Sequence, residues 1–418
     1  MKLDHNQFVN IDVVFPVLKS PIKVIDLSHN KIASISPKVF MNLKYIEDLD
    51  LSYNTLTSET LKPEVFEGKY DPDMYEPLKP LKKLKLSFNL IHSLHPDVFE
   101  HTPNLQVLQL DNNPFQILSM GVLTALSSIP QLQELDMGYI EISDIPEETF
   151  HPLRNLKNLK LAGNLFKTIP NALKYAINVN YLTLDENPLH DINELNPMPT
   201  MKKLETLSLT YIAPMKMIGK GAISGMESLK TLHLCNNHHL EYIHPNAFTF
   251  PEKDNVERLQ WPPVTSLFLQ SNNLTALDSD LFANWNDMKE IHIHDNPWMC
   301  DCENQWLIDV LIPILKVKTT HLINNIKCAF PHPMVDMKLV DLNENKSHMR
   351  CLDKYGNNPS TDSAVLVALL IGVIAGIPLA FAAILLWKRG CFGVFRQGPA
   401  DFSRAFYKRA DSQENAQI

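Results

Sequence analysis

The sequence is poor in glycine and lacks several short catalytic motifs. It has only 13 glycines against 29 prolines, which argues against a nucleotide-binding fold built on glycine-rich loops. No P-loop, G-x-S-x-G or H-E-x-x-H motif occurs. A formal net charge of −9, with 20% charged residues, favours neither nucleic-acid binding nor wholesale disorder. We therefore expect a protein that is not an enzyme and that uses no cofactor or metal.

One long segment lacks charge altogether. Residues 364–387 contain no Asp, Glu, Lys or Arg and no polar stripe, and 24 residues in a helix can cross a hydrocarbon core of about 30 Å. The segment predicts one transmembrane helix. Lys388 and Arg389 follow it directly, so the positive-inside rule places the tail in the cytoplasm and the first 363 residues outside the plasma membrane. The tail carries six basic and three acidic residues, which leaves −12 on the rest of the chain.

A repeated pattern fills most of the remaining sequence. IKVIDLSHNKIASI, which begins at Ile22, and LKKLKLSFNLIHSL, which begins at Leu81, share the frame L-x-x-L-x-L-x-x-N-x-L-x-x-L. Eleven such frames begin at residues 22, 46, 81, 105, 132, 156, 179, 204, 229, 264 and 288. Repeats of this length indicate a solenoid. The pattern resembles the leucine-rich repeat family, and the resemblance extends to about residue 351.

The frame has a physical meaning. The two leucines of L-x-L point to the same side of a short strand, and each strand buries that side by stacking on its neighbours. The Asn amide satisfies backbone groups that would otherwise be buried unpaired. We predict an α/β-type repeat solenoid, a curved horseshoe with short parallel strands on its concave face. Phenylalanines are expected to fill the convex core, and Ile140 and Ile212 to interrupt the Asn ladder; the phenylalanines are Phe40, Phe99, Phe150 and Phe282.

The frame also fits the first residues, MKLDHNQFVN. Leu3 falls on the second strand leucine and Asn6 on the ladder Asn, and this frame would begin two places before Met1. Phe8, Ile11 and Phe15 fall on or beside later apolar positions of the frame. The stretch has no apolar run and no cleavage site, so it is not a secretory signal. We therefore expect that a signal peptide and a further repeat or cap are missing upstream.

Two frames are longer than the others, at 35 residues. Their extra residues, 67–80 and 250–263, are rich in Pro and charged side chains. Insertions in solenoids form surface loops that often bind partners, and tolerated drift in loop length explains them equally well.

Four cysteines follow the last frame. The sequence NPWMCDCENQW resembles the cysteine-rich C-terminal cap of extracellular leucine-rich repeat proteins, which implies the pairs Cys300–Cys328 and Cys302–Cys351. The residues alone allow three pairings. A zinc site is the alternative, but C-x-C with distant partners beside a membrane span disfavours it. The expected segments are the solenoid at 1–297, the cap at 298–351, a juxtamembrane linker at 352–363, the helix at 364–387 and the tail at 388–418.

Several residues are candidates for modification or self-association. Asn273 and Asn345 lie in N-x-[ST] glycosylation sequons. Cys391 follows the membrane span closely and is a candidate for palmitoylation, and Cys235 is left as a free thiol. Gly372 and Gly376 form a G-x-x-x-G motif, which can support a homodimer.

The positions around L-x-L are predicted to face outward on the concave side and to bind a protein partner. Scattered Tyr and Phe favour an interface, although these rings can also pack on one another across strands. His292 and His294 are expected to share a solvated strand face, with His233 two strands away. At about 10 Å, His233 is too far from them to share one metal ion directly. The predicted binding residues are Asp50, Tyr53, Lys85, Phe88, Asp111, Asp136, Tyr139, Asp185, Tyr211 and Phe268.

These features together predict a single-pass cell-surface protein that binds a protein partner in an adhesion, receptor or co-receptor role. The 31-residue tail is too short for a kinase or a Toll/interleukin-receptor signalling domain, so any signalling needs a recruited partner. The alternative is a non-signalling carrier or scaffold subunit that presents another protein at the membrane.

Overall fold

The computed structural model describes residues 1–17, 20–68, 70–71, 74–75, 77–252, 259–351 and 359–388. The chain divides into two units, Met1–Arg350 and Cys351–Ile418, and each is described by itself. The first unit contains both the repeats and most of the cysteine-rich cap.

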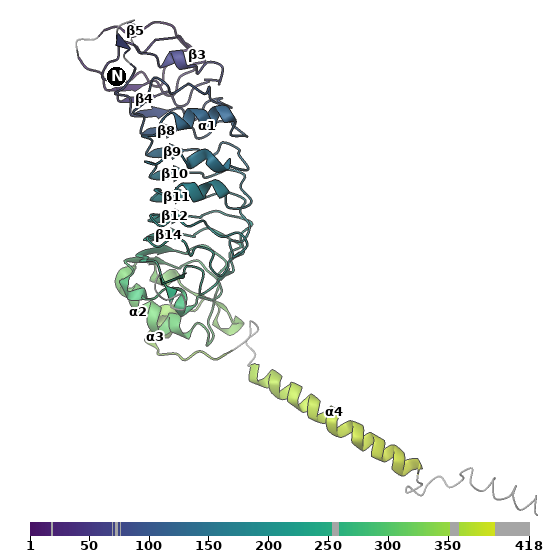
Figure 1. Ribbon diagram of the computed structural model, residues 1–418. Coiled ribbons are helices and arrows are strands. Elements are labelled where there is room, and N and C mark those ends of the chain that lie inside the picture. The colour runs from purple at the N-terminus through teal and green to yellow at the C-terminus, as the bar shows by residue number, and fades with distance from the viewer. Residues whose placement is uncertain are drawn as a thin grey trace, which may run out of the picture. The chain divides into compact units, whose positions relative to one another are not determined.

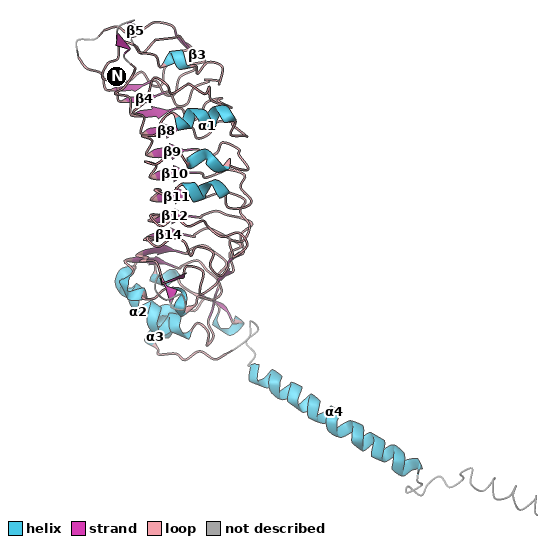
Figure 2. Cartoon of the chain, viewed as in Figure 1, coloured by secondary structure: helices cyan, strands magenta, loops and turns pink. Residues whose placement is uncertain are grey.

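The first unit is a solenoid built on an eleven-stranded parallel sheet (Figures 1 and 2). The fourth position of every predicted frame lies at the centre of a three-residue strand, and these central residues align across the sheet, as in Ile25↔Leu49 and Leu84↔Leu108. The predicted repeat solenoid is therefore confirmed. The strands are β2 (Val24–Asp26), β4 (Asp48–Asp50), β7 (Lys83–Lys85), β8 (Val107–Gln109), β9 (Glu134–Asp136), β10 (Asn158–Lys160), β11 (Tyr181–Thr183), β12 (Thr206–Ser208), β14 (Thr231–His233), β18 (Ser266–Phe268) and β19 (Glu290–His292).

The core lies between the sheet and the convex side. Leu49 and Leu51, the two leucines of one L-x-L, are both fully buried. Phe40 and Phe150 are also fully buried on the convex side, and Phe40 stacks on Phe66 with ring centroids 6.5 Å apart. Short helices cover this side in Figure 2: η1 (Pro63–Val65), α1 (Met120–Ser127), η2 (Glu147–Phe150), η3 (Asn171–Tyr175), η4 (Ser279–Leu281) and η5 (Trp285–Asp287).

Four pairs of two-residue strands complete the repeats. Two pairs are parallel and join neighbouring repeats: β1 (Asn10–Ile11) with β3 (Ser34–Ile35), and β13 (Met217–Ile218) with β15 (Tyr242–Ile243). The other two pairs are antiparallel and lie in the two long frames: β5 (Tyr70–Asp71) with β6 (Met74–Tyr75), and β16 (Phe250–Pro251) with β17 (Leu259–Gln260). Each predicted insertion thus contains an antiparallel pair of short strands.

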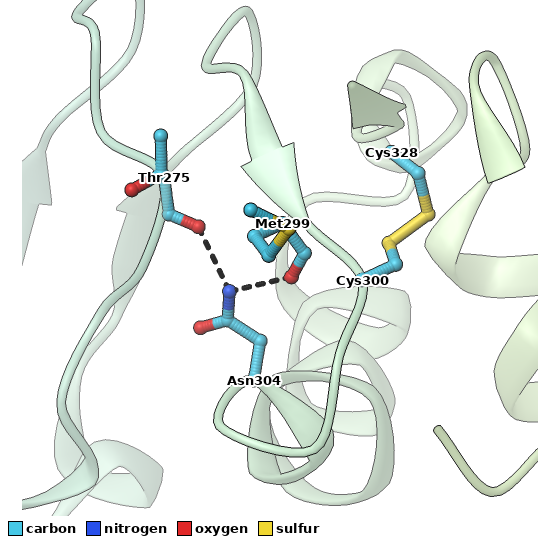
Figure 3. The surroundings of a disulfide bond; sticks show 5 residues. All are labelled: Thr275, Met299, Cys300, Asn304 and Cys328. Atoms are coloured by element: carbon cyan, nitrogen blue, oxygen red, sulfur yellow. Dashed lines mark hydrogen bonds between the residues drawn. A yellow bond between two sulfur atoms is a disulfide. The ribbon is translucent and has the colours of Figure 1, made fainter. Parts of the chain in front are cut away.

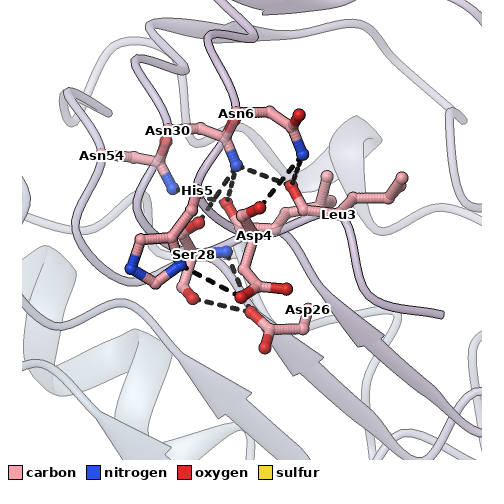
Figure 4. Close-up of polar contacts among 9 residues, drawn as sticks. Leu3, Asp4, His5, Asn6, Asp26, Ser28, Asn30 and Asn54 are labelled. Atoms are coloured by element: carbon pink, nitrogen blue, oxygen red, sulfur yellow. Dashed lines mark hydrogen bonds and ion pairs between the residues drawn. The ribbon is translucent and has the colours of Figure 1, made fainter.

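The Asn ladder ties each repeat to the one before it. Asn54 Nδ2 donates to Leu27 O and Leu51 O, both at 3.0 Å. The first residues follow the same rule, because Asn30 Nδ2 donates to Leu3 O at 2.9 Å and Asn6 Nδ2 donates to Leu3 O at 3.0 Å (Figure 4). The frame predicted for Leu3 and Asn6 is therefore present in the structure.

The two interruptions of the ladder are bridged by neighbouring asparagines. Asn164 Oδ1 accepts from the N–H groups of both Ile140 and Ile142, each at 3.3 Å. Asn237 Oδ1 accepts from Ile212 N at 2.7 Å. Buried backbone donors beside Ile140 and Ile212 are therefore paired although the local Asn is missing.

The cap closes the last repeat. Its elements are β20 (Trp298–Met299), η6 (Leu307–Leu311), α2 (Ile312–Lys318), η7 (Ile323–Asn325), β21 (Cys328–Phe330), η8 (His332–Met334) and α3 (Leu339–Glu344). A disulfide joins Cys300 to Cys328, and Cys302 and Cys351 are also disulfide-bonded. Asn304 Nδ2 donates to Thr275 O at 2.8 Å, which anchors the cap to the final repeat (Figure 3).

The second unit contains helix α4 (Pro359–Lys388), whose segment Val365–Leu386 is long and apolar enough to cross a membrane. The helix begins five residues before the predicted residue 364, because Pro359 is favourable at the first helical position and a polar turn precedes the apolar run. Residues 352–358, Cys391 and the tail from residue 389 lie outside the described residues.

Candidate functional site

The outward-facing residues of the eleven strands form the concave face, and charge is unevenly distributed over it. Strands β2, β4, β7, β9 and β10, but not β8 between them, carry acids and lysines: Asp26, Asp48, Asp50, Lys83, Lys85, Glu134, Asp136 and Lys160. Strands β11, β12, β14 and β18 present no Asp, Glu, Lys or Arg, but only Tyr181, Thr183, Thr206, Ser208, Thr231, His233, Ser266 and Phe268. The concave face thus has an acidic N-terminal half and an uncharged half of four strands, and β19 beyond these carries Glu290.

Two lysines partly neutralise the acidic half. Lys85 Nζ lies 3.0 Å from Asp50 Oδ2, on the neighbouring strand. Lys160 Nζ lies 3.0 Å from Glu134 Oε1 and 3.3 Å from Asp136 Oδ2. The side chains of these pairs are partly buried, and the pairs order them on the concave face.

The acids of this half crowd one another. Burial raises the pKa of Asp48, and the charges of Asp50 and Asp26 raise it further against the opposing effect of Lys85. Burial likewise raises the pKa of Asp136, with Asp111 as the next contribution. The acidic half is therefore a surface that a cation would stabilise.

A row of residues in the left-handed conformation runs along the edge of the sheet where the strands end, and we call it the edge row. Each member lies immediately before the ladder position, in a turn where φ is between 50° and 70°. The edge row consists of His5, His29, Tyr53, Phe88, Asn112, Tyr139, Gly163, Glu186, Tyr211, Asn236, Ser271 and Asp295.

Four rings of the edge row form a continuous stack. Centroids lie 4.5 Å apart for His5 and His29, and 4.1 Å apart for both His29–Tyr53 and Tyr53–Phe88. The prediction placed Tyr53 and Phe88 on the strands, whereas the structure places them three residues beyond β4 and β7. The prediction did not include His5 and His29. Each of them directly precedes a ladder Asn, so aligning the repeats on that Asn would have identified them. The rings remain accessible, with exposed fractions of 42% for Tyr53 and 40% for Phe88.

Tyr139 is held in place differently. Its ring lies over Gly163, so that a Cβ at Gly163 would come within 2.0 Å of it. Burial, a hydrogen bond to Glu186 and nearby carboxylates raise the pKa of Tyr139 to about 12. The Tyr139 ring therefore packs on the edge-row residue of the next repeat, Gly163, while 41% of the surface of Tyr139 stays exposed.

A smaller ring cluster lies on β14, β18 and β19. Phe268 lies between His233, with centroids 4.4 Å apart, and His292, with centroids 4.9 Å apart. Burial lowers the pKa of His233, which favours its neutral imidazole. Among the described residues no group of three or more His, Cys, Asp or Glu could hold a metal ion.

The remaining predicted sites are spread over the molecule. Asp111 and Asp185 follow β8 and β11, and each accepts a serine hydroxyl, from Ser87 and Ser208 respectively. Tyr211 belongs to the edge row and is 55% exposed. The sequon residues differ in surroundings: Asn345 is exposed, whereas Asn273 Nδ2 is 3.3 Å from Glu241 Oε1 and its backbone N–H bonds Leu240 O. Cys235 is a free, buried cysteine.

Comparison with known proteins agrees with this geometry. The family model described as leucine rich repeat matches residues 1–68, 79–139 and 130–189. The chain is a leucine-rich repeat protein. It is similar to Tsukushi of Gallus gallus, at 28% identity over 52% of this chain and 56% of that protein. It is also similar to the transforming growth factor beta activator LRRC33 of Danio rerio, at 30% identity over 44% of this chain and 25% of that protein.

A solved structure shows the same fold. The leucine-rich repeat protein superposes with a TM-score of 0.53 and 17% identity on a chain of the octameric complex of Latrophilin 3, Unc5D and FLRT2, covering 78% of this chain and 91% of that one. The leucine-rich repeat protein spans about half the length of Tsukushi and a quarter of LRRC33. Its apolar helix near the C-terminus fits a single-pass membrane protein.

Proposed function

We propose that this leucine-rich repeat protein is a single-pass plasma-membrane protein whose extracellular concave face and edge row bind a protein partner, in an adhesion, receptor or co-receptor role. The observation that carries the proposal is the row of accessible aromatic side chains along one edge of the sheet, in which Tyr53 stacks on Phe88; the row consists of Tyr53, Phe88, Tyr139 and Tyr211. Exposed Tyr is enriched at interface hot spots, and rigid rings lose little entropy on binding.

Two further observations support it. The repeat domain of FLRT2, which shares this fold, belongs to a protein complex. Helix α4 supplies a membrane anchor, and the basic residues Lys388 and Arg389 favour an outside location for the repeats. No catalytic role is proposed for any residue.

The test begins by finding the partner through affinity enrichment with the full chain. Binding is then compared for a variant with Tyr53, Phe88, Tyr139 and Tyr211 changed to Ala. We expect binding to be abolished while export persists. A matched control changes four exposed apolar residues away from the concave face, namely Tyr45, Ile117, Leu195 and Val317, and should bind normally. Unchanged binding by the first variant would refute the proposal.

The carrier role stays as a second candidate. Deleting residues 390–418 separates the two roles. Loss of the cellular response supports a receptor, whereas full retention supports a carrier or an adhesion protein.

A further inference from the structure

The edge row has a gap at Asn112. Phe88 ends the four-ring stack on one side of Asn112, and Tyr139 stands on the other side. Strands β7, β8 and β9 are consecutive neighbours, and parallel strands lie about 4.8 Å apart, so the backbones that carry Phe88 and Tyr139 are roughly 10 Å apart.

At Asn112 an amide side chain interrupts the row of rings. Rings in the stack approach to 4.1 Å, and two such spacings fit between the flanking backbones. The Asn112 amide bonds to the neighbouring acid, because its Nδ2 donates to Asp111 Oδ2 at 3.0 Å. Tyr139 covers Gly163 on the far side. Phe88 contacts Tyr53 with one face, and no second ring partner of Phe88 occurs among the described residues.

The gap is also negatively charged. Asp111 accepts from two neutral donors, the Ser87 hydroxyl and the Asn112 amide, and no ion pair reaches it within the described part of the chain. A carboxylate has about four acceptor sites, so Asp111 can accept more hydrogen bonds. The neighbouring lysines, Lys85 and Lys160, are directed to other acids.

We propose that the protein partner inserts an arginine side chain at Asn112, where the guanidinium stacks on Phe88 and donates to Asp111. The inference rests on the proposed function and specifies one contact of it. Arginine suits the gap better than lysine, because a guanidinium is planar, stacks on aromatic faces and presents five donors. The negative charge of Asp111 contributes to raising the pKa of Asp136, which shows that the two acids repel each other. A cation bound at Asp111 would reduce this repulsion.

The probes are three fluorescent hexapeptides, of arginine, lysine and citrulline, titrated against the full chain in detergent micelles by fluorescence anisotropy. Citrulline keeps the planar shape but has no charge. We expect the arginine peptide to bind at least about fivefold more tightly than the lysine peptide, as one stacked cation predicts, and the citrulline peptide not to bind.

Two variants test the position of the contact. Asn112→Tyr fills the gap with a ring, and Tyr53, Tyr139 and Tyr211 show that tyrosine adopts this backbone conformation. Asp111→Asn removes the charge. Each should weaken binding of the arginine peptide at least about fivefold.

Matched controls lie in the corresponding positions of other repeats. Asn236→Tyr is the same change in the edge row beside the uncharged half, and Asp185→Asn removes the equivalent acid after β11. Both variants should bind the arginine peptide with unchanged affinity. Equal affinities for the arginine and lysine peptides, or unchanged affinity in Asn112→Tyr, would overturn the inference.

The same variants separate this inference from the proposed function. If the identified partner binds Asn112→Tyr normally but fails to bind the variant without the four aromatic residues, the arginine contact is refuted and the proposed function stands. If the partner binds both variants normally, the arginine contact and the proposed function are both refuted.

Discussion

Asn164 is expected to contribute more to stability than an ordinary ladder asparagine. Its side chain donates to Met137 O at 2.8 Å and accepts from Ile140 N and Ile142 N at 3.3 Å each. These three groups have no other partner among the described residues, whereas Leu161 O, a further acceptor of Asn164, also accepts from Asn187. Asn164→Ala would leave one carbonyl and two N–H groups unpaired in the core.

The cost follows from the number of orphaned groups. An unsatisfied buried group costs about 1–3 kcal/mol, so three groups predict a loss of about 3–9 kcal/mol in unfolding free energy. Asn113 is the matched comparison, because its substitution orphans only Leu110 O and Ile91 N while Leu86 O keeps its bond from Asn89. Asn113→Ala orphans one group fewer and is therefore expected to cost about 1–3 kcal/mol less than Asn164→Ala.

The assay is urea unfolding of the disulfide-intact full chain, followed by circular dichroism. Asn104→Ala serves as the control, because Asn104 is exposed and donates to Lys79 O alone. A loss at Asn164 no greater than that at Asn113 would refute the idea that Asn164 serves two backbone donors.

Three further predictions concern the cap, the edge row and pH. Opening the Cys300–Cys328 bridge, which spans 28 residues, by Cys328→Ser should cost about 3–4 kcal/mol in urea unfolding; an unaltered midpoint would contradict this. Gly163→Ala should displace the Tyr139 ring and lower the pKa of Tyr139 from about 12 toward its ordinary value of 10.0, measured by NMR titration of labelled tyrosine; an unshifted pKa would argue against the contact. Burial lowers the pKa of His233 below 6.5, so the unfolded state binds the proton first and stability falls as pH drops through 6.5; His233→Gln should show a smaller loss between pH 7 and 5, and an identical pH profile would refute this.

The repeats could be predicted because one local rule determines each of them. The alternation of buried and exposed residues in L-x-L places the strand centres, such as Leu84 and Leu108, and the same spacing repeats along the chain. The cap was predictable from its resemblance to known caps, and the apolar helix from its length and lack of charge.

The edge row could not be predicted as a structure. Alternation assigns Tyr53 and Phe88 to a strand face, but the chain turns into a positive-φ conformation after Ser52 and Ser87 so that the following Asn can enter the core. The pairing of Asn164 with two neighbouring N–H groups was equally hidden, because it depends on what the adjacent repeat lacks.

The most direct test of the account is hydroxyl-radical footprinting of the full chain with and without its identified partner, read by mass spectrometry at single side chains. The account predicts that labelling of Tyr53, Phe88, Tyr139 and Tyr211 falls on binding, while labelling of Tyr45, which is 60% exposed, stays the same. Protection of Tyr45 with no change at the four edge-row aromatics would contradict it.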